Sequence, residues 1–548
     1  MAKKNAGNYL ERKMAAMYAK FDVWQERVAG LLVILLLCVH PLYLTPQRYI
    51  NLTRHKFTFF CICVGLALFL TLVIWVLRVT RSPRLVPRGH LHLADWAVLG
   101  FAIVTLLSAI FSPFKDLVNV WTGKPEPQGR YDGAITQLLY VATFFIVSRW
   151  YKPRKRDFNV FGIAATIVAL LGVLQFYGMD FLKLWPNVGE YKVENFYRIL
   201  FRSTLGNVDI VSTFVCVAIL LNGFLFIRLK SKWQPLWLAA SALNFWLMDL
   251  ADAYSGRVGI AAAMLLSVPF IVENRKTLGR TLILGSSWLA VYTLQNLLYD
   301  ANIVGERTAA SLLPYAGAVA ALLVAGVVLL VVGGKGTGAR GAEEQGEPEA
   351  DDRPGKVALS KWLPGVILIV VFIVAGIVGV EVLGKRAAEV EYPSGLVYEL
   401  REVLHGNIYD ELGTNRVYIW RNALSAYPNH PVIGSGPDTF LYAFPAEAHG
   451  RYWENYDKAH NEYIQILICQ GILGLACYLV FLVSASIKAV PKAFQNPLVA
   501  AVLAAFIGYC VQAFFNISLP IASQMLWVLA AMLANKRFRD ATLENIPG

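Results

Sequence analysis

The chain has 548 residues, of which 57% are hydrophobic and only 16% are charged, and its mean hydropathy is +0.50. Soluble globular proteins carry about 25% charged residues, so this composition excludes an ordinary soluble domain and indicates an integral membrane protein. The formal net charge of +13 does not indicate nucleic-acid binding, because most Lys and Arg residues lie in short loops beside apolar runs, as membrane-orientation signals do.

The apolar runs are about 20 residues long, which favours membrane helices over the roughly 10-residue alternating strands of a membrane barrel. We therefore predict an all-α, polytopic membrane protein with about fourteen transmembrane helices and one large, partly helical extracytoplasmic loop before a late span. The predicted spans are 28–45, 57–77, 93–112, 134–149, 159–178, 208–227, 233–251, 257–273, 281–298, 309–332, 362–383, 463–487, 497–515 and 520–535.

Basic residues cluster in alternate loops, which predicts that both termini are cytoplasmic. The Gly-, Glu- and Pro-containing segment 333–361 has no apolar face and is predicted to be a disordered cytoplasmic linker. The predicted order along the chain is a basic cytoplasmic N-terminus (1–27), helices 1–10 (28–332), the linker (333–361), helix 11 (362–383), the large extracytoplasmic loop (384–462), helices 12–14 (463–535) and a cytoplasmic C-terminus (536–548).

The large loop carries two arginines around a tryptophan, in the segment Asn415–Leu424. Arg416 and Trp420 are four residues apart, so they share a face if this segment is a helix capped by Thr414 or Asn415. A surface helix packed on the membrane would explain its apolar residues, whereas a phosphate clamp would explain Arg416 and, less readily, Arg421.

His460 stands at the end of the same loop, immediately before Asn461 and the next apolar run. A neutral histidine can accept a proton from a hydroxyl group. The alternative is an interfacial residue at a helix start that Asn461 caps. Three further histidines of the loop are rival bases: His405, His430 and His449.

The shorter outer loops also contain arginines, on the side where basic residues are under-represented. Arg257 lies where the turn Ala253–Arg257 enters a span; it either extends toward lipid headgroups or faces a cavity that binds phosphate. Arg130, Arg202 and Asn207 lie in glycine-containing loops and are weaker candidates. The sequence has no HExxH motif, CxxC pair or clustered histidine set, so we expect no metal site, and the seven cysteines lie within apolar runs, as packing residues do.

Together these motifs resemble the O-antigen ligase and polymerase superfamily, bacterial multi-span glycosyltransferases that use lipid-linked sugars. The matching segments occur in order over roughly residues 100–480: Trp121–Gly133, Arg202–Asp209, Ser255–Arg257, Asn415–Leu424, Pro431–Phe440 and Ala459–Gly474. One departure is the turn Gly206–Asp209, which reads GNVD where the family often has GNPN.

The resemblance implies transfer of a glycan from an undecaprenyl-diphosphate carrier to a hydroxyl acceptor, at the outer face of the cytoplasmic membrane of a bacterium. It implies an inverting reaction without a metal or other cofactor, in which Arg257 and Arg416 hold the diphosphate and His460 activates or orients the acceptor. The residues expected to line the substrate site are Arg130, Arg202, Asn207, Trp420, Arg421 and Asn461.

Several functions share these motifs. The preferred hypothesis is a ligase, which would transfer a finished glycan to a terminal acceptor. A polysaccharide polymerase and a protein O-oligosaccharyltransferase are the alternatives within the superfamily. Outside the enzyme class, a transporter of the lipid-linked glycan would require polar residues near the membrane midplane, whereas the polar residues of this chain cluster at the outer face.

Overall fold

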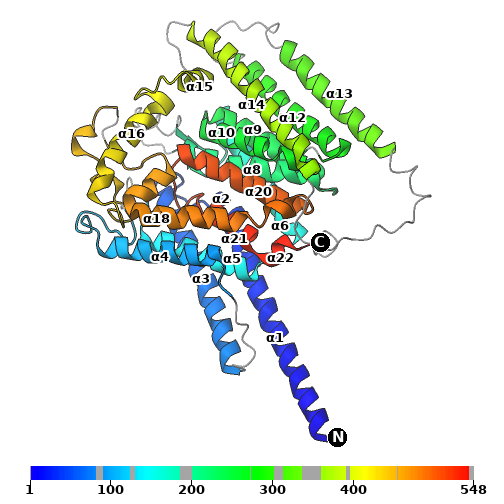
Figure 1. Ribbon diagram of the computed structural model, residues 1–548, viewed down its shortest axis with the longest axis vertical. Helices are drawn as coiled ribbons and strands as arrows, with labels where there is room; N and C mark the ends of the chain where they lie inside the picture. The colour runs from blue at the N-terminus through cyan, green and yellow to red at the C-terminus, as the bar shows by residue number, and fades with distance from the viewer. Residues whose placement is uncertain are drawn as a thin grey trace.

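The computed structural model describes residues 2–81, 90–123, 130–185, 200–252, 254–271, 273–300, 313–335, 359–389, 395–452 and 455–541. Within these ranges the fold is helical, as predicted (Figure 1). Its one sheet is a two-stranded antiparallel ribbon, β1 (Phe201–Arg202) with β2 (Gly206–Asn207). Most of the predicted linker, residues 336–358, lies outside the described ranges.

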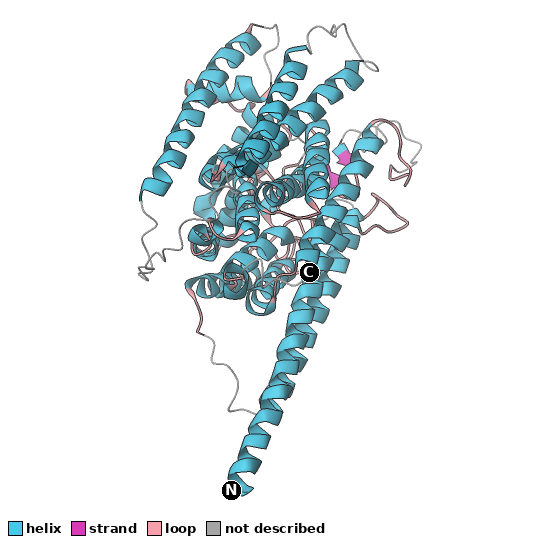
Figure 2. Ribbon diagram, turned by 90° about the vertical axis from the view of Figure 1, so that its right-hand side faces the viewer, coloured by secondary structure: helices cyan, strands magenta, loops and turns pink. Residues whose placement is uncertain are grey.

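The described part of the first half is built mainly of helices, joined by loops of very different lengths (Figures 1 and 2). They are α1 (Ala2–Ile34), the π-helical turn η1 (Leu35–Val39), α2 (His40–Leu42), α3 (Leu52–Arg81), α4 (Leu93–Ile110), α5 (Ala134–Trp150), α6 (Lys155–Phe176), α8 (Val208–Arg228), α9 (Gln234–Leu250), α10 (Tyr254–Leu266), α11 (Val268–Ile271) and α12 (Arg275–Asp300).

The second half contains two long helices, then the large loop, then the last helices of the bundle. They are α13 (Leu313–Lys335), α14 (Leu359–Ala388), α15 (Leu396–Leu404), α16 (Leu412–Ala426), η4 (Tyr427–Asn429), α17 (Phe440–Ala443), η5 (Ala446–Ala448), α18 (Glu462–Ser486), α19 (Val490–Ala493), α20 (Pro497–Gln512), η6 (Ala513–Phe515), α21 (Gln524–Ala534) and α22 (Lys536–Arg539).

Eight helices of the described residues are long and apolar enough to cross a membrane, so the predicted count of about fourteen is not confirmed. Each of the fourteen predicted ranges nevertheless contains a helix. Three of them are apolar but short: Ala134–Trp150, Tyr254–Leu266 and Gln524–Ala534. The predicted range 257–273 is divided at Ser267, between α10 and α11, because Pro269 has no N–H to donate to the carbonyl of Leu265 and its ring crowds that carbonyl.

The centre of the bundle is α8, whose apolar stretch is completely buried. It packs against α9, α20, α10 and α12. Small residues allow these helices to approach closely: a Cβ added to Gly259 would lie 2.7 Å from the carbonyl oxygen of Gly508 in α20. Close packing of small residues is the usual means of helix association in membranes, where apolar burial alone gives no preference for protein over lipid.

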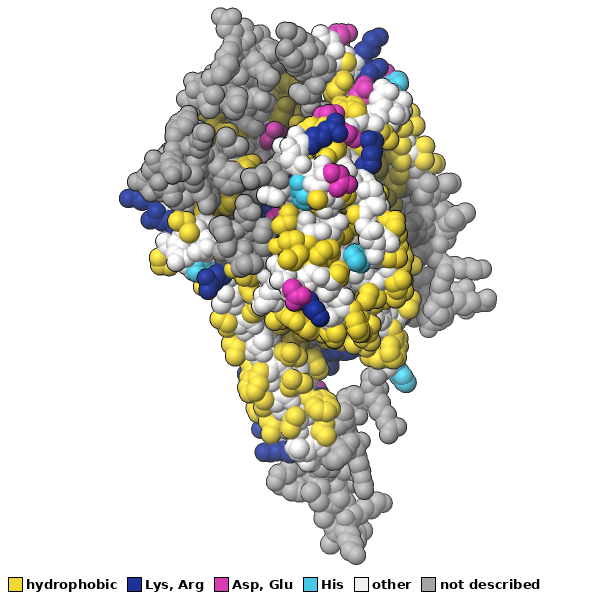
Figure 3. Space-filling model, turned by 90° about the vertical axis from the view of Figure 1, so that its left-hand side faces the viewer, with side chains coloured by type: hydrophobic (Ala, Val, Ile, Leu, Met, Phe, Trp, Pro, Cys, Tyr) yellow, Lys and Arg dark blue, Asp and Glu magenta, His cyan; other side chains and the backbone are white. Residues whose placement is uncertain are grey.

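The periphery is apolar and exposed, as expected for helices that face lipid. Only 6% of the α13 span is buried, and α13 and α14 lie at the margin of the bundle (Figure 1). The opposite margin carries α1 and α3, which project beyond the other helices (Figure 1). Exposed apolar side chains on one face and interspersed charges near the large loop are visible in Figure 3.

The large loop has its own core and is joined to a break in α18. Its buried residues include Tyr418, Ile419 and Phe440, which pack with Ile468 and Cys469 of α18. The α18 helix is interrupted at Gly471 (φ 69°, ψ −173°). These contacts hold the large loop against α18, the helix that begins directly after His460 and Asn461.

The segment Pro431–Gly436 supplies hydrogen bonds at this break. Ser435 N and Gly436 N donate to the carbonyls of Ile468 and Cys469, at 2.9 and 3.0 Å. In the other direction, Ile472 N donates to Pro431 O at 2.9 Å. Such a close approach requires glycine: a Cβ on Gly434 would collide with the backbone of Cys469.

Candidate functional site

The residues predicted to be central, Arg416 and His460, meet on either side of a carboxylate. Arg416 Nη2 lies 3.6 Å from Asp209 Oδ1, and His460 Nδ1 lies 3.7 Å from Asp209 Oδ2. Asp209 is in the first turn of α8, where a negative charge is favoured by the helix dipole. The sequence analysis did not include Asp209 among the site residues, although it closes the GNVD turn that departs from the family pattern.

Local backbone geometry presents both side chains. Gly413, Thr414 and Asn415 have φ values of 65°, 60° and 67°, so the regular part of α16 begins at Arg416 rather than after a Thr414 or Asn415 cap. His460 has a φ of 48° and immediately precedes Asn461. Left-handed backbone in residues other than glycine is costly and occurs often at functional sites.

Two polar atoms at this junction are buried without a hydrogen-bond partner among the described residues, Arg416 Nε and His460 Nδ1. Buried polar groups normally have partners, so two unsatisfied nitrogens beside one carboxylate indicate a site whose contacts change when a ligand binds. The side chains of Arg416, His460 and Asp209 keep 16%, 25% and 18% of their accessible surface, so the junction is open at one side.

The pKa of His460 is lowered to about 4. Desolvation by burial is the largest cause, Arg416 and Arg130 act in the same direction, and Asp209 and Asp457 oppose it. His460 is therefore neutral at pH 7 and has a lone pair available to accept a proton.

Arg130 is bound in a two-point ion pair with Asp457. Arg130 Nε and Nη2 donate to the two carboxylate oxygens at 2.7 and 3.2 Å. The arginine lowers the pKa of Asp457 below its ordinary value, against the effect of burial. The predicted cavity-lining Arg130 thus lies near His460, and its contact fixes the segment that leads to that histidine.

Lys458 lies between two carboxylates beneath this segment. Its Nζ is 2.8 Å from Asp132 Oδ2 and 3.1 Å from Asp438 Oδ1, and only 1% of its side chain is exposed. Burial lowers the pKa of Lys458, but the two carboxylates outweigh it, so that the pKa is raised overall. Burial also raises the pKa of Asp132 to about 6; Lys458 opposes this shift and Asp438 adds to it.

Sequence reasoning missed this triad, although each member lies in or directly beside a motif that the resemblance used. Asp132 belongs to Trp121–Gly133, Asp438 to Pro431–Phe440, and Lys458 directly precedes Ala459–Gly474. The available signal was a charged residue in or directly beside each of three separated motifs. Spacing along the chain, however, does not show which charges meet.

The helix that follows the site begins at a cap formed by Asn461, the alternative that the sequence offered for this segment. Its side-chain oxygen accepts hydrogen bonds from Tyr463 N and Ile464 N at 3.0 and 3.1 Å. Asn207 has the same function at α8, accepting from Asp209 N at 2.8 Å. Both asparagines therefore orient site residues through a helix terminus.

The α16 helix divides its predicted residues between two faces. Trp420 is on the same side as Arg416, and its Nε1 donates to Ala459 O at 3.0 Å, beside His460. Arg421 is on the exposed side and pairs with Asp410 at 2.6 Å. Trp420 thus belongs to the junction, whereas the contacts of Arg421 are on the outer surface of the loop.

Arg202 lies in the β1–β2 ribbon. Its Nη1 donates to Phe201 O at 2.9 Å, and its guanidinium lies 5.5 Å from the ring centre of Phe176. Burial lowers the pKa of Arg202, with Tyr49 opposing. The next residue, Ser203, accepts a 2.6 Å hydrogen bond from Tyr49 through its carbonyl oxygen.

Arg257, the third residue predicted to be central, pairs with acidic residues at the end of α9 and in the turn that follows it. Its Nη2 lies 2.9 Å from Asp249 Oδ1 and 3.2 Å from Asp252 Oδ1, and its Nε is buried without a hydrogen-bond partner among the described residues. Ser255 connects this turn to the junction, because Asn516 Nδ2 lies 3.4 Å from Ser255 Oγ and 2.7 Å from Asp209 O.

The three rival histidines have other neighbours. His405 Nε2 lies 2.9 Å from Glu381 Oε2, and His430 is edge-on to Phe114. His449 Nδ1 accepts a hydrogen bond from Tyr456 N at 3.1 Å. Among the four histidines of the loop, His460 is therefore the one that the described contacts bring to Asp209.

Within the described ranges, no three side chains of the His, Cys, Asp and Glu types are grouped so as to hold a metal ion. The cations that face the junction are instead arginines.

Comparison with known proteins supports the motif resemblance. Residues 310–479 match the family described as O-antigen ligase, a segment that contains Arg416, Trp420, Arg421, His460 and Asn461. No curated protein matches the chain. The match supports the resemblance to the O-antigen ligase superfamily for the part of the chain that carries the large loop and the start of α18.

Proposed function

We propose that the protein is a glycosyltransferase of the O-antigen ligase type, transferring a glycan from undecaprenyl diphosphate to a hydroxyl acceptor. The family match supports a membrane enzyme of the ligase or polymerase type that uses lipid-linked glycans. The observation that carries the proposal further is the junction of Arg416, Asp209 and His460, with its two buried, unsatisfied nitrogens.

His460 is proposed as the base. With Nδ1–H directed to Asp209, its Nε2 accepts the acceptor hydroxyl proton while the acceptor oxygen forms a bond to the anomeric carbon. Asp209 stabilises the imidazolium that results, as carboxylates do in related dyads. The 3.7 Å separation would shorten in the substrate complex, because catalytic hydrogen bonds are often long before substrate binds.

Arg416 and Arg257 are proposed to bind the donor diphosphate. The bond from the anomeric carbon to the diphosphate oxygen breaks, and its electron pair stays on the leaving lipid diphosphate. Planar guanidinium groups suit phosphate oxygens and can neutralise the developing charge without a metal. Both arginines now contact carboxylates, so a diphosphate would compete with Asp209 and Asp249 for them.

A single displacement inverts the anomeric centre, because the acceptor attacks from the side opposite the leaving group. Trp420, Arg130, Arg202, Asn207, Asn461 and Arg421 are proposed to line or support the substrate site, with Arg421 at its outer edge. We place this site on the extracytoplasmic side of a bacterial cytoplasmic membrane, since the basic loops that mark the cytoplasmic side lie at the other helix ends.

The test is a reconstituted transfer assay. Purified protein in liposomes receives a labelled undecaprenyl-diphosphate oligosaccharide, first alone and then with candidate acceptors, and product lengths are resolved on a gel. A single addition that requires an acceptor supports the ligase. A ladder from donor alone would identify a polymerase, and labelled polypeptide a protein O-oligosaccharyltransferase.

Variants connect the assay to the geometry. His460→Ala should lower the transfer rate on the order of 10²–10⁴-fold, the usual contribution of a positioned base. His405→Ala is the matched control, because that histidine contacts Glu381 at the surface. Equal rates for His460→Ala and the parent protein would contradict the proposed base, and absence of transfer with every acceptor would favour a transporter.

A further inference from the structure

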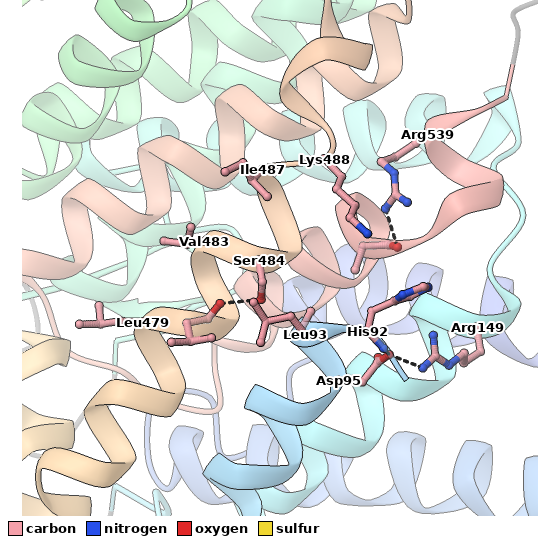
Figure 4. Close-up of a pocket in the computed structure, with 13 residues that line it drawn as sticks. His92, Leu93, Asp95, Arg149, Leu479, Val483, Ser484, Ile487, Lys488 and Arg539 are labelled. Carbon is pink, nitrogen blue, oxygen red and sulfur yellow. Dashed lines mark hydrogen bonds and ion pairs between the residues drawn. The ribbon is translucent and has the colours of Figure 1, made fainter. Parts of the chain in front are cut away.

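A cavity with one polar and one apolar wall lies at the opposite end of α18 from His460. It has a volume of about 470 Å³ and lies between the N-terminus of α4, the C-terminal parts of α5 and α18, and the end of α21 with α22 (Figure 4). None of the candidate transferase residues lines it. Its chemistry is therefore independent of the proposed reaction.

One wall of the cavity is an apolar track along α18. Leu479, Val480, Val483 and Ile487 line it and are 43%, 42%, 60% and 59% exposed. Leu93 of α4 closes the track and is 65% exposed. On a membrane helix, such a surface faces hydrocarbon, so the track has the chemistry to hold an acyl chain.

The other wall is cationic. Arg149, Lys488 and Arg539 lie on the side of the cavity away from Leu479 and Val483 (Figure 4). They are balanced by one carboxylate, since Asp95 pairs with Arg149 at 2.6 Å.

The other two cations differ in what holds them. The Nη1 of Arg539 donates to Leu533 O and Ala534 O, the last carbonyls of α21, so its guanidinium is held in place at the rim. Lys488 is exposed, and within the described residues it has no ion-pair partner. The rim thus presents a fixed guanidinium and a free ammonium beside an apolar track.

We propose that this cavity binds an anionic glycerophospholipid of the surrounding leaflet. The phosphodiester would lie against Lys488 and Arg539, and one acyl chain would follow Val480, Val483 and Ile487. Basic pockets between membrane helices commonly take anionic lipid headgroups, and a phosphodiester supplies the negative charge that the rim lacks. The apolar wall alone would accept any acyl chain, and the cationic wall alone would accept any anion. The two walls together select a lipid with an anionic headgroup.

The experiment uses the full chain in nanodiscs and a phosphatidylglycerol probe with a photoreactive acyl chain. Crosslinked peptides are mapped, and competition is measured with unlabelled phosphatidylglycerol, phosphatidylcholine of the same chains, and inorganic phosphate. Labelling within 479–488, with strong competition by phosphatidylglycerol alone, is expected. Equal competition by phosphatidylcholine would show that the negative charge of the headgroup does not contribute to binding. Displacement by inorganic phosphate would show a simple anion site. Either result overturns the proposal.

Two variants test the two walls separately. Lys488→Gln should weaken phosphatidylglycerol binding about fivefold, the factor that corresponds to about 1 kcal/mol per basic residue near an anionic surface. Val483→Trp should block the acyl track without changing the charge. Lys276→Gln, an exposed lysine at the start of α12, is the matched control. An equal loss in Lys276→Gln, or no loss in both cavity variants, would refute the assignment.

Discussion

Replacing Lys458 by methionine should destabilise the protein strongly, because it leaves two buried carboxylates without their shared cation. The side chains of Lys458, Asp132 and Asp438 are only 1%, 6% and 3% exposed, and the ammonium lies 2.8 and 3.1 Å from the two carboxylates. Removing one partner of a buried ion pair typically costs about 3–5 kcal/mol. The loss should fall in this range, since methionine fills a similar volume but carries no charge.

A triple variant separates the cost of the unpaired carboxylates from the cost of lost packing. The triple variant Lys458→Met, Asp132→Asn, Asp438→Asn removes all three charges and should recover most of the stability, because a neutral buried set avoids the unpaired charges. The measurement is the fraction of monodisperse protein that survives heating in detergent, as unfolding of a large membrane protein is rarely reversible. Lys276→Met is the surface control.

The pH dependence of the stability of Lys458→Met gives an independent check of this explanation. Burial and Asp438 raise the pKa of Asp132 to about 6 against the effect of Lys458, so removing the lysine should raise this pKa further. A carboxyl whose pKa is raised by folding binds a proton in the folded state that the unfolded chain releases, so protonation stabilises the fold below that pKa. Lys458→Met should therefore be less destabilised at pH 5 than at pH 8. A variant that survives heating as well as the parent at pH 8, or a triple variant no better than the single one, would refute the reasoning.

Three further outcomes follow from the geometry. If neutral His460 is the base, kcat/KM should fall on the acid side with an apparent pKa near 4, because burial lowers the pKa of this group. The pH profile of the transfer rate measures this value, and an apparent pKa of about 6.5 would contradict the proposed role. Gly434→Ala should prevent correct folding, as judged by recovery of monodisperse protein, because the added Cβ would collide with the backbone of Cys469. Gly450→Ala is the control: Gly450 also has left-handed backbone, but no atom lies near its added Cβ, so the change should cost only about 1 kcal/mol. Equal recoveries would show that the close approach of Gly434 to Cys469 is unimportant. Asp457→Asn should release Arg130 from its two-point contact and lower kcat about tenfold. Its loss of thermal stability should be smaller than that of Lys458→Met, because the Arg130–Asp457 pair is partly exposed. An unchanged kcat would show that the pair does not position the site.

The sequence by itself determined the class of protein and the approximate positions of its apolar helices. Apolar runs of membrane length can satisfy their backbone groups only as helices in lipid, so each predicted span contains one. The cap at Asn461 was predictable too, because an asparagine before an apolar run accepts hydrogen bonds from the free N–H groups of the first turn. The residue types in the motifs, in their order, were enough to predict the superfamily, and the pairing of Arg416 with Trp420 on one face followed from helical spacing.

Only the tertiary structure decided which charges meet. Arg130 and Asp457 are 327 positions apart, and Lys458 and Asp132 are 326 apart, so no helical or strand period relates them. Asp209 became a site residue because α8 begins beside the large loop, and Arg257 was directed to Asp249 and Asp252. The physical reason is that a Coulomb interaction depends on distance and burial, which packing of distant segments sets, whereas helix formation depends on neighbours that the sequence already places together.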